Sequence, residues 1–536
     1  MKYTSRTLKW MIPIIFLLIS IVIYSYITLI TQRNINGNEL FTLVNDITSG
    51  YKLRQIVVAV LMFIIGYILA QCIFEKQSDT VKAIWAMPIS VVAWSVCSVV
   101  ILFIRLPYIR SLMLGVVLIL IFVVTYLRRD YIKKINLASM CRYVIWCVGL
   151  SIFFSTGIIP TIMSSDSYYY VMQYGEVIAK TGSLSFDTAG ATMTWTGISS
   201  ALISALACFG GFETITVIHN LLITSLLCCF YLTMLQQLED FGLDKKFAAF
   251  WAIIFTIMLM IIPAFELLSF WVISNTYCMV YIFFLMIGLK IYISQECENR
   301  ELLILLSMMV SWLALSRAEM SVCMACMVCL ISVLPVQKRD MLTLAVPMTI
   351  LQFLYLIELD YQQHISERTV YDSMLTPQIQ AIMLLALMGC IIYSLFIESK
   401  IFKQIRNRMS VILFVGIPLL YVGIYFMNNE KFIESIKSIG FNFTTQYWGY
   451  APFIILILIM VVIWNKKNNY WMVFSAGYIL INLALCLGRK QPLRDGYGDS
   501  CNRIMMSAIP IIFFALICSV SEVVLSHFKV EKEHEV

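Results

Sequence analysis

Residues 10–31 read WMIPIIFLLISIVIYSYITLIT, an apolar run without a charged side chain. A helix needs about 20 mostly apolar residues to cross a bilayer. Similar runs recur to the end of the chain, without the alternation of apolar and polar residues that a membrane β-barrel requires. Backbone groups in lipid must form their hydrogen bonds within the segment, so we expect these runs to be helices. The sequence therefore predicts an all-α, polytopic transmembrane bundle.

The composition agrees with this class. Of the 536 residues, 61% are hydrophobic and 13% are charged, and the mean hydropathy is +0.87. A soluble domain averages about 25% charged residues, so the chain has little room for one. We place about sixteen spans along the chain. These are 10–31, 56–74, 83–104, 111–127, 143–162, 216–236, 247–263, 268–293, 301–316, 318–335, 341–357, 380–397, 410–427, 451–465, 470–487 and 504–526.

Lysine and arginine gather in alternate loops between these spans. Cytoplasmic loops are rich in these residues, so the clusters set the orientation. The clusters lie at 128–134, 245–246, 338–339, 400–408 and 466–467. With them inside, both termini are predicted to be cytoplasmic and the first run to be a retained signal anchor. The formal net charge of +7 follows from these loops, and we expect no nucleic-acid partner.

Four segments on the predicted outer side are long enough to build a site. They are 163–196, 358–379, 428–450 and 488–503. Within the third, apolar residues at Phe432, Ile433, Ile436 and Ile439 predict a helix that lies in the membrane interface.

The cysteines and histidines do not suggest a metal centre. Cys323, Cys326 and Cys329 have a C-x-x-C-x-x-C spacing, but they fall in an apolar run without a clear fourth ligand. We interpret them as small apolar residues of a helix. No two of the four histidines share a helix face, so a zinc site is not expected.

The first outer segment carries the first candidate site. Asp166 directly follows a span, where a carboxylate can stay ionised and act as a general base. Alternatively, Asp166 caps a helix over 167–178. Aromatic and acidic side chains follow it in the same segment: Tyr168, Tyr169, Tyr170, Glu176, Asp187 and Trp195.

The last outer segment carries the second candidate site. Residues 488–503 hold four basic side chains and two acidic ones, a net charge of +2 on the side where positive charge is disfavoured. The basic side chains are Arg489, Lys490, Arg494 and Arg503. Such a group is suited to binding phosphate. Contact with lipid headgroups, or pairing with Asp495 and Asp499, is the alternative.

Two further charged positions lie close to apolar runs. Arg317 and Glu319 lie between two short runs, where charges usually face a protein interior or a cavity. The pair either contributes to a site or only shapes the turn. Glu266 lies in an outer turn, three residues after Pro263.

The outer segments together resemble those of the GT-C glycosyltransferases, polytopic enzymes that use polyprenyl-linked sugars. The resemblance rests on Asp166 after a span, on a helix ending near Gly182, and on the Trp-Thr-Gly entry at Trp195. Ser-Arg-Ala-Glu at 316–319 is similar to the family's Arg-Pro-Glu turn, with alanine in place of proline. The segment 498–503 is similar to its closing segment.

The resemblance covers the chain from about Tyr143 to the end. It implies a GT-C-like core over 143–536, preceded by a four-span addition over 1–142. One departure is Ser165, which stands where the family often has a second acidic residue.

The resemblance also implies an activity. The chain is expected to be an inverting hexosyltransferase that moves a sugar from a polyprenyl-phosphate donor to a glycan, lipid or protein acceptor. Asp166 is then the base, and Arg489, Lys490, Arg494, Arg503 and Arg317 are candidates for binding phosphate. Tyr168, Tyr169 and Trp195 either stack on sugars or form an interfacial belt, and Glu176, Asp187, Glu266 and Glu319 are possible supporting residues. No obligatory metal or other cofactor is expected, and the expected location is a bacterial cell membrane.

Two other functions fit the same features. A polymerase of lipid-linked glycan repeats needs the same compartment and external arginines. A flippase or transporter of lipid-linked oligosaccharide favours mid-span charges and two related halves. The sequence has mid-span charge mainly near Arg317 and no visible internal repeat.

Overall fold

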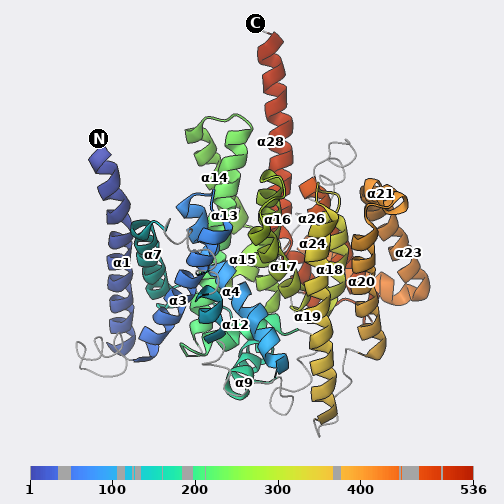
Figure 1. The fold of residues 1–536 in the computed structure, drawn as a ribbon, viewed down its shortest axis with the longest axis horizontal. Coiled ribbons are helices and arrows are strands. Elements are labelled where there is room, and N and C mark those ends of the chain that lie inside the picture. Colours follow the sequence, from blue (N-terminus) through green and yellow to red (C-terminus); the bar gives the residue numbers. More distant parts are fainter. Residues whose placement is uncertain are drawn as a thin grey trace. The chain divides into compact units, whose positions relative to one another are not determined.

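The computed structural model describes most of the chain. The described residues are 2–33, 50–104, 115–122, 126, 135–159, 161–183, 197–211, 213–365, 376–445, 448, 470–489, 491–496 and 499–534. They form helices joined by turns and short loops (Figure 1), without a β-strand in these ranges. An isolated parallel bridge joins Ile162 to Trp271. The predicted all-α class is confirmed.

The chain forms two compact units. The first unit comprises Met1–Leu226, Phe270–Ser274 and Leu354–Met374, and the second comprises Leu227–Ser269, Asn275–Phe353 and Leu375–Val536. The division of the chain at residue 142 stays a prediction.

The first unit is built from long apolar helices and a set of short ones. Its helices are α1 (Lys2–Arg33), α3 (Gly50–Ile73), α4 (Asp79–Ile104), α7 (Leu137–Phe154), α8 (Ser165–Ser167), the π-helical turn η1 (Tyr168–Met172), α9 (Gln173–Thr181), α12 (Ser199–Ala207) and the first half of α13 (Thr214–Asp240). Within this unit α3 packs against α4, and α1 packs against α7.

The second unit holds the remaining helices. They are α14 (Lys245–Met260), α15 (Pro263–Phe270), α16 (Ser274–Ser294), α17 (Arg300–Ala314), α18 (Ala318–Ile331), α19 (Lys338–Ile365), α20 (Pro377–Phe396), α21 (Lys400–Asn407), α22 (Met409–Val411), η2 (Ile412–Gly416), α23 (Ile417–Met427), α24 (Asn429–Thr445), α26 (Tyr470–Gly488), α27 (Ser500–Met506) and α28 (Ile509–His534). Phe270 of α15, Ser274 of α16 and the end of α19 from Leu354 belong to the first unit.

Ten helices in the described ranges are long and apolar enough to cross a membrane, or up to twelve if two bent pairs each form one span. The multi-span character is therefore confirmed, whereas the count of about sixteen and the orientation stay predictions. The predicted spans 301–316 and 318–335 are α17 and α18, helices of 15 and 14 residues. The predicted span 451–465 lies outside the described residues, and 111–127 lies only partly within them.

The predicted span 268–293 is wrong at its start, because the helix is broken there. The Ile162 N–H donates to the Phe270 carbonyl over 2.7 Å, and the Val272 N–H donates to the Ile162 carbonyl over 3.3 Å. These hydrogen bonds replace the helical ones, so α16 begins only at Ser274. Upstream, α14 and α15 meet at a bend of 73°.

Gly66 allows the close approach of α3 to α4. A Cβ atom at Gly66 would lie 1.7 Å from the carbonyl oxygen of Ala86. Small residues at such crossings let two helix backbones pack closely where lipid supplies no hydrophobic driving force. The α3–α4 pair therefore depends on this glycine.

Replacing Gly66 with leucine is expected to lower the free energy of unfolding by about 1–3 kcal/mol, because the larger side chain must push the helices apart. Thermal unfolding in detergent measures the effect. Gly389→Leu is the matched control, since Gly389 lies in α20 and a Cβ atom there meets nothing within 4 Å. Equal midpoints for the two variants would contradict the close approach.

Candidate functional site

Asp166 lies in the first turn of a helical segment that runs from Ser165 to Thr181. The segment contains the π-helical turn η1 and ends at Gly182, whose left-handed φ of 72° suits glycine. Single π-helical turns occur often at functional sites. The expected helix over 167–178 is confirmed, and it begins slightly earlier than predicted.

Ser164 caps this helical segment. The Ser164 hydroxyl accepts the Ser167 N–H over 3.3 Å, and the Ser164 N–H donates to the Ser167 hydroxyl over 3.1 Å. This reciprocal pair satisfies the exposed amides in the manner of a capping box. The capping interpretation of Asp166 stays a prediction. The half-buried carboxylate lies where the positive end of the helix favours negative charge.

The start of this helical segment is fixed by a distant part of the same unit. Trp271 Nε1 donates to the Ser164 hydroxyl over 2.8 Å. The bridge between Ile162 and Trp271 holds the same two stretches together through their backbones. The helix break at 271–273 thus positions the residue that caps the helix of Asp166.

The far half of the segment is anchored in the core of the first unit. A Cβ atom at Gly175 would lie 2.4 Å from the Ser204 Cβ and 2.6 Å from the Ala201 carbonyl oxygen, so α9 packs tightly on α12. Tyr174 is fully buried. Its burial raises the pKa of Tyr174 well above the ordinary value, and the charge of Glu358 adds to the effect.

Glu358 is a buried acidic residue that the sequence pattern does not indicate as part of a site. It lies in the part of α19 that belongs to the first unit, is 3% exposed, and accepts a hydrogen bond from Gln362 Nε2 over 2.7 Å. The available signal was its position at the outer end of a predicted span, where a carboxylate is unfavourable without a role or a partner.

The other predicted residues of this loop have different settings. Tyr168 and Tyr169 are about half exposed, and their rings meet edge to face with centroids 5.3 Å apart. Glu176 forms an ion pair with Lys180 over 2.6 Å at the surface, one turn further along the helix. Asp187 and Trp195 lie outside the described residues, as does the side chain of Tyr170.

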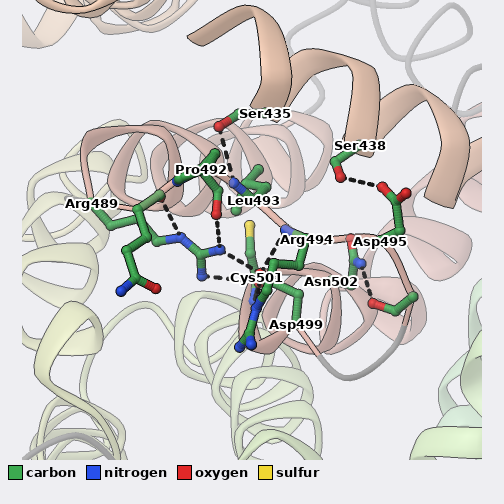
Figure 2. Close-up of polar contacts among 12 residues, drawn as sticks. Ser435, Ser438, Arg489, Pro492, Leu493, Arg494, Asp495, Asp499, Cys501 and Asn502 are labelled. Carbon is green, nitrogen blue, oxygen red and sulfur yellow. Dashed lines mark hydrogen bonds and ion pairs between the residues drawn. The ribbon is translucent and has the colours of Figure 1, made fainter. Parts of the chain in front are cut away.

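In the second unit, the loop after α26 is folded around Asp499 (Figure 2). Arg489 donates to both Asp499 carboxylate oxygens, and the distance from Nη1 to Oδ1 is 3.0 Å. Its remaining donors reach the carbonyls of Gln491 and Pro492 over 3.1 and 2.8 Å. Nearly all of its N–H groups thus already hold the loop, and the predicted role of Arg489 as a phosphate ligand stays a prediction.

Asp499 collects hydrogen bonds from three directions. Besides Arg489, the backbone N–H groups of Arg494 and Cys501 donate to it over 2.9 and 2.8 Å, and the second of these caps α27. Burial raises the pKa of Asp499, but the hydrogen bonds lower it by more, so that its pKa lies below the ordinary value. The pairing of the basic loop with Asp499 is confirmed for Arg489.

Helix α24 holds the same loop from the other side. Ser435, Ser438 and Asn442 share one face of α24 and are buried. Ser435 accepts the Leu493 N–H over 3.1 Å, and Ser438 donates to the Asp495 carboxylate (Figure 2). Asn442 donates to the Arg494 carbonyl over 3.2 Å. The helix predicted over this segment is confirmed, and its polar face is covered by protein.

The three described arginines of the loop thus differ. Arg489 is committed to Asp499, and Arg503 is buried in α27. Arg494 is 75% exposed, with Nε 3.9 Å from Asp499 Oδ2. Lys490 lies outside the described residues. Arg494 is therefore the described arginine of this loop whose side chain is mostly exposed.

Arg317 is a buried cation at the break between α17 and α18. It is 6% exposed, and its Nε donates to Glu319 Oε1 over 2.6 Å. Its Nη1 lies 3.4 Å from Asn275 Oδ1. The internal pair is confirmed, and Glu319 neutralises the charge of Arg317 inside the second unit. Glu266 is exposed in the first turn of α15.

Comparison with protein-family models, curated proteins and solved structures finds no match. The resemblance to GT-C enzymes therefore rests on the motifs alone. In the described ranges no three His, Cys, Asp or Glu side chains gather as a metal ion requires. Independence from a metal stays a prediction.

The lowered pKa of Asp499 gives a pH-dependent contribution to stability. Its hydrogen bonds stabilise the fold fully above the ordinary pKa of 3.8, and this stabilisation is lost as the pH falls through the folded-state value. Asp499→Asn is expected to lower the free energy of unfolding at neutral pH by about 3–5 kcal/mol. The difference from wild type should shrink as the pH falls below about 4, measured by chemical unfolding.

Asp495→Asn is the matched control, since Asp495 is an exposed carboxylate of the same loop that accepts one hydroxyl. Its effect should be about 1 kcal/mol or less. A difference between wild type and Asp499→Asn that does not change with pH would contradict the assignment.

Proposed function

We propose that this chain is a membrane glycosyltransferase that moves a sugar from a polyprenyl-phosphate carrier to an acceptor hydroxyl on the extracytoplasmic side of a bacterial cell membrane. The observation that carries the proposal is the setting of Asp166. Its carboxylate lies in the first turn of a helix whose start is fixed by hydrogen bonds of Ser164 to Ser167 and to Trp271. A carboxylate held by a rigid helix start is suited to proton transfer.

The proposed reaction is one inverting displacement. The acceptor hydroxyl attacks the anomeric carbon and passes its proton to the Asp166 carboxylate, while the bond from that carbon to the phosphate oxygen breaks. The polyprenyl phosphate leaves with the electron pair. Positive charge near that phosphate stabilises the leaving group, as electrostatic stabilisation does in other transfer reactions.

Arg494 is the proposed ligand of the phosphate. Its exposed guanidinium can bind a phosphate bidentately, and its backbone is held by Asp499 and by Asn442 of α24. Arg489 supports phosphate binding indirectly, because its hydrogen bonds keep the loop of Arg494 folded. Asp166 and Arg494 belong to different units, and each role is proposed from contacts within its own unit.

The half-exposed rings of Tyr168 and Tyr169 lie two and three residues after Asp166 and support a carbohydrate ligand. Aromatic faces of this kind stack on sugar rings, although the membrane interface favours the same side chains. The acceptor is proposed to be a cell-envelope glycan, a lipid or a protein.

A transporter of lipid-linked oligosaccharide is the second candidate. The buried ion pair of Arg317 and Glu319 favours it, because the pair lies at a break between two helices. Transporters often build their binding sites from broken helices inside the membrane. Movement of lipid-linked sugar across vesicles, without transfer of the sugar, would favour this function.

Asp166→Asn is expected to lower sugar transfer by about 100-fold to 10,000-fold, the range for removal of a general base. The measurement is transfer of radiolabelled sugar from a panel of polyprenyl-phosphate donors in membranes that contain equal amounts of each protein. Glu176→Gln is the matched control, since it removes an acidic side chain from the same helical segment.

Wild-type transfer that Asp166→Asn abolishes and Glu176→Gln retains supports the proposal. Equal transfer by wild type and Asp166→Asn removes Asp166 from the role of base. Products that form a ladder of repeat units would favour the polymerase.

A further inference from the structure

The second unit contains a cavity that the proposed reaction does not use. Its volume is about 440 Å³, within the range of small-ligand sites. It is lined by Lys290, Ile293, Ser294, Val333, Leu334, Pro335, Arg406 and Trp471. These residues come from α16, from the turn between α18 and α19, from α21 and from α26.

The cavity is positively charged. Lys290 and Arg406 both line it, and none of its eight described lining residues is acidic. Lys290 Nζ donates to Gln237 Oε1 and lies 5.6 Å from the centre of the Phe514 ring. Arg406 Nη2 donates to the Leu334 carbonyl over 3.0 Å, so one bond fixes the guanidinium at the wall. Two fixed cations favour an anionic ligand.

The rest of the lining is mainly apolar. Ile293, Val333 and Leu334 contribute aliphatic surface, and Trp471 contributes an indole ring. A free phosphate ion gains nothing from such surface, whereas the glycerol and first methylene groups of a lipid bury apolar area against it. The lining therefore suits a phosphate that is attached to an apolar chain.

Helix α21 supplies a second, independent indication. Lys400, Lys403 and Arg406 recur at three-residue spacing, which places them along one side of the helix. Ile401 is 69% exposed, so the helix presents apolar surface as well as charge. The helix bends by 73° from the apolar helix that follows it. A short basic amphipathic helix of this kind is typical of a membrane interface.

The sequence pattern predicts which interface this is. The basic clusters at 338–339 and 400–408 belong to the loops expected in the cytoplasm. Anionic lipids of the inner leaflet attract such clusters, and basic pockets between transmembrane helices on that side bind lipid headgroups.

We propose that this cavity binds the phosphate headgroup of an anionic lipid of the inner leaflet, with Arg406 and Lys290 supplying the positive charge. The site is separate from the residues proposed for sugar transfer. Its expected role is to hold α16, α21 and α26 together at the membrane surface.

Native mass spectrometry of the delipidated full-length protein tests this site. The probes are dioleoylphosphatidylglycerol and dioleoylphosphatidylcholine, titrated separately. The wild type should bind the first phosphatidylglycerol molecule more tightly than the first phosphatidylcholine molecule. Arg406→Gln should weaken phosphatidylglycerol binding by about fivefold, the effect of one charge near a membrane surface.

Lys403→Gln is the matched control, because it removes the same charge from the same helix but does not line the cavity. It should bind phosphatidylglycerol as the wild type does. Ser294→Trp is a second variant that fills the cavity from an exposed position and keeps both cations. It should also weaken binding, so the test does not depend on the folding of Arg406→Gln.

Equally weakened phosphatidylglycerol binding in Arg406→Gln and Lys403→Gln would overturn the proposal, because the lipid would then respond only to the overall charge of α21. Equal binding of the two lipids by the wild type would also overturn it. Displacement of phosphatidylglycerol by millimolar inorganic phosphate would assign the cavity to a free anion and overturn the lipid assignment.

Discussion

Each buried polar group needs a hydrogen-bond partner within the protein, and this requirement governs the structure. In an apolar surrounding no water satisfies a free N–H, carbonyl or charge, so the chain forms helices wherever it is apolar. Where a helix breaks, as at 271–273, the released backbone groups bond to Ile162 instead. The same requirement explains the setting of Asp499, whose buried carboxylate accepts hydrogen bonds from several residues of one loop. It also explains the setting of Arg317, whose charge is paired with Glu319 two residues later.

This requirement separates side chains that hold the fold from side chains that meet a ligand. In the loop after α26, Arg489 donates to Asp499 and to backbone carbonyls, while the guanidinium of Arg494 is exposed. At the start of the helical segment 165–181, Ser164 caps the helix, and the carboxylate of Asp166 lies in its first turn. In both places a residue close in the chain stabilises the backbone that carries the charged group. The proposed glycosyltransferase reaction uses these two groups.

The sequence predicted the features that depend on local pattern. The all-α class follows from the length of apolar runs, and the helix over 429–445 follows from the spacing of its isoleucines. Pattern could not identify which arginine pairs with Asp499, because four basic residues at similar distances along the chain offer equal candidates. It also missed the break before Ser274, because that break depends on Ile162, more than 100 positions away.

The proposed reaction requires Asp166 and Arg494 to face the extracytoplasmic side. Labelling of introduced cysteines with a membrane-impermeant maleimide in intact cells tests this requirement, with wild type as the background. Tyr169→Cys replaces an exposed side chain close to Asp166, Arg494→Cys replaces Arg494 itself, and Lys403→Cys replaces an exposed side chain in the basic helix α21. We expect the first two to be labelled in intact cells, and the third only after permeabilisation. Labelling of Lys403→Cys in intact cells, or protection of either of the other two, would contradict it.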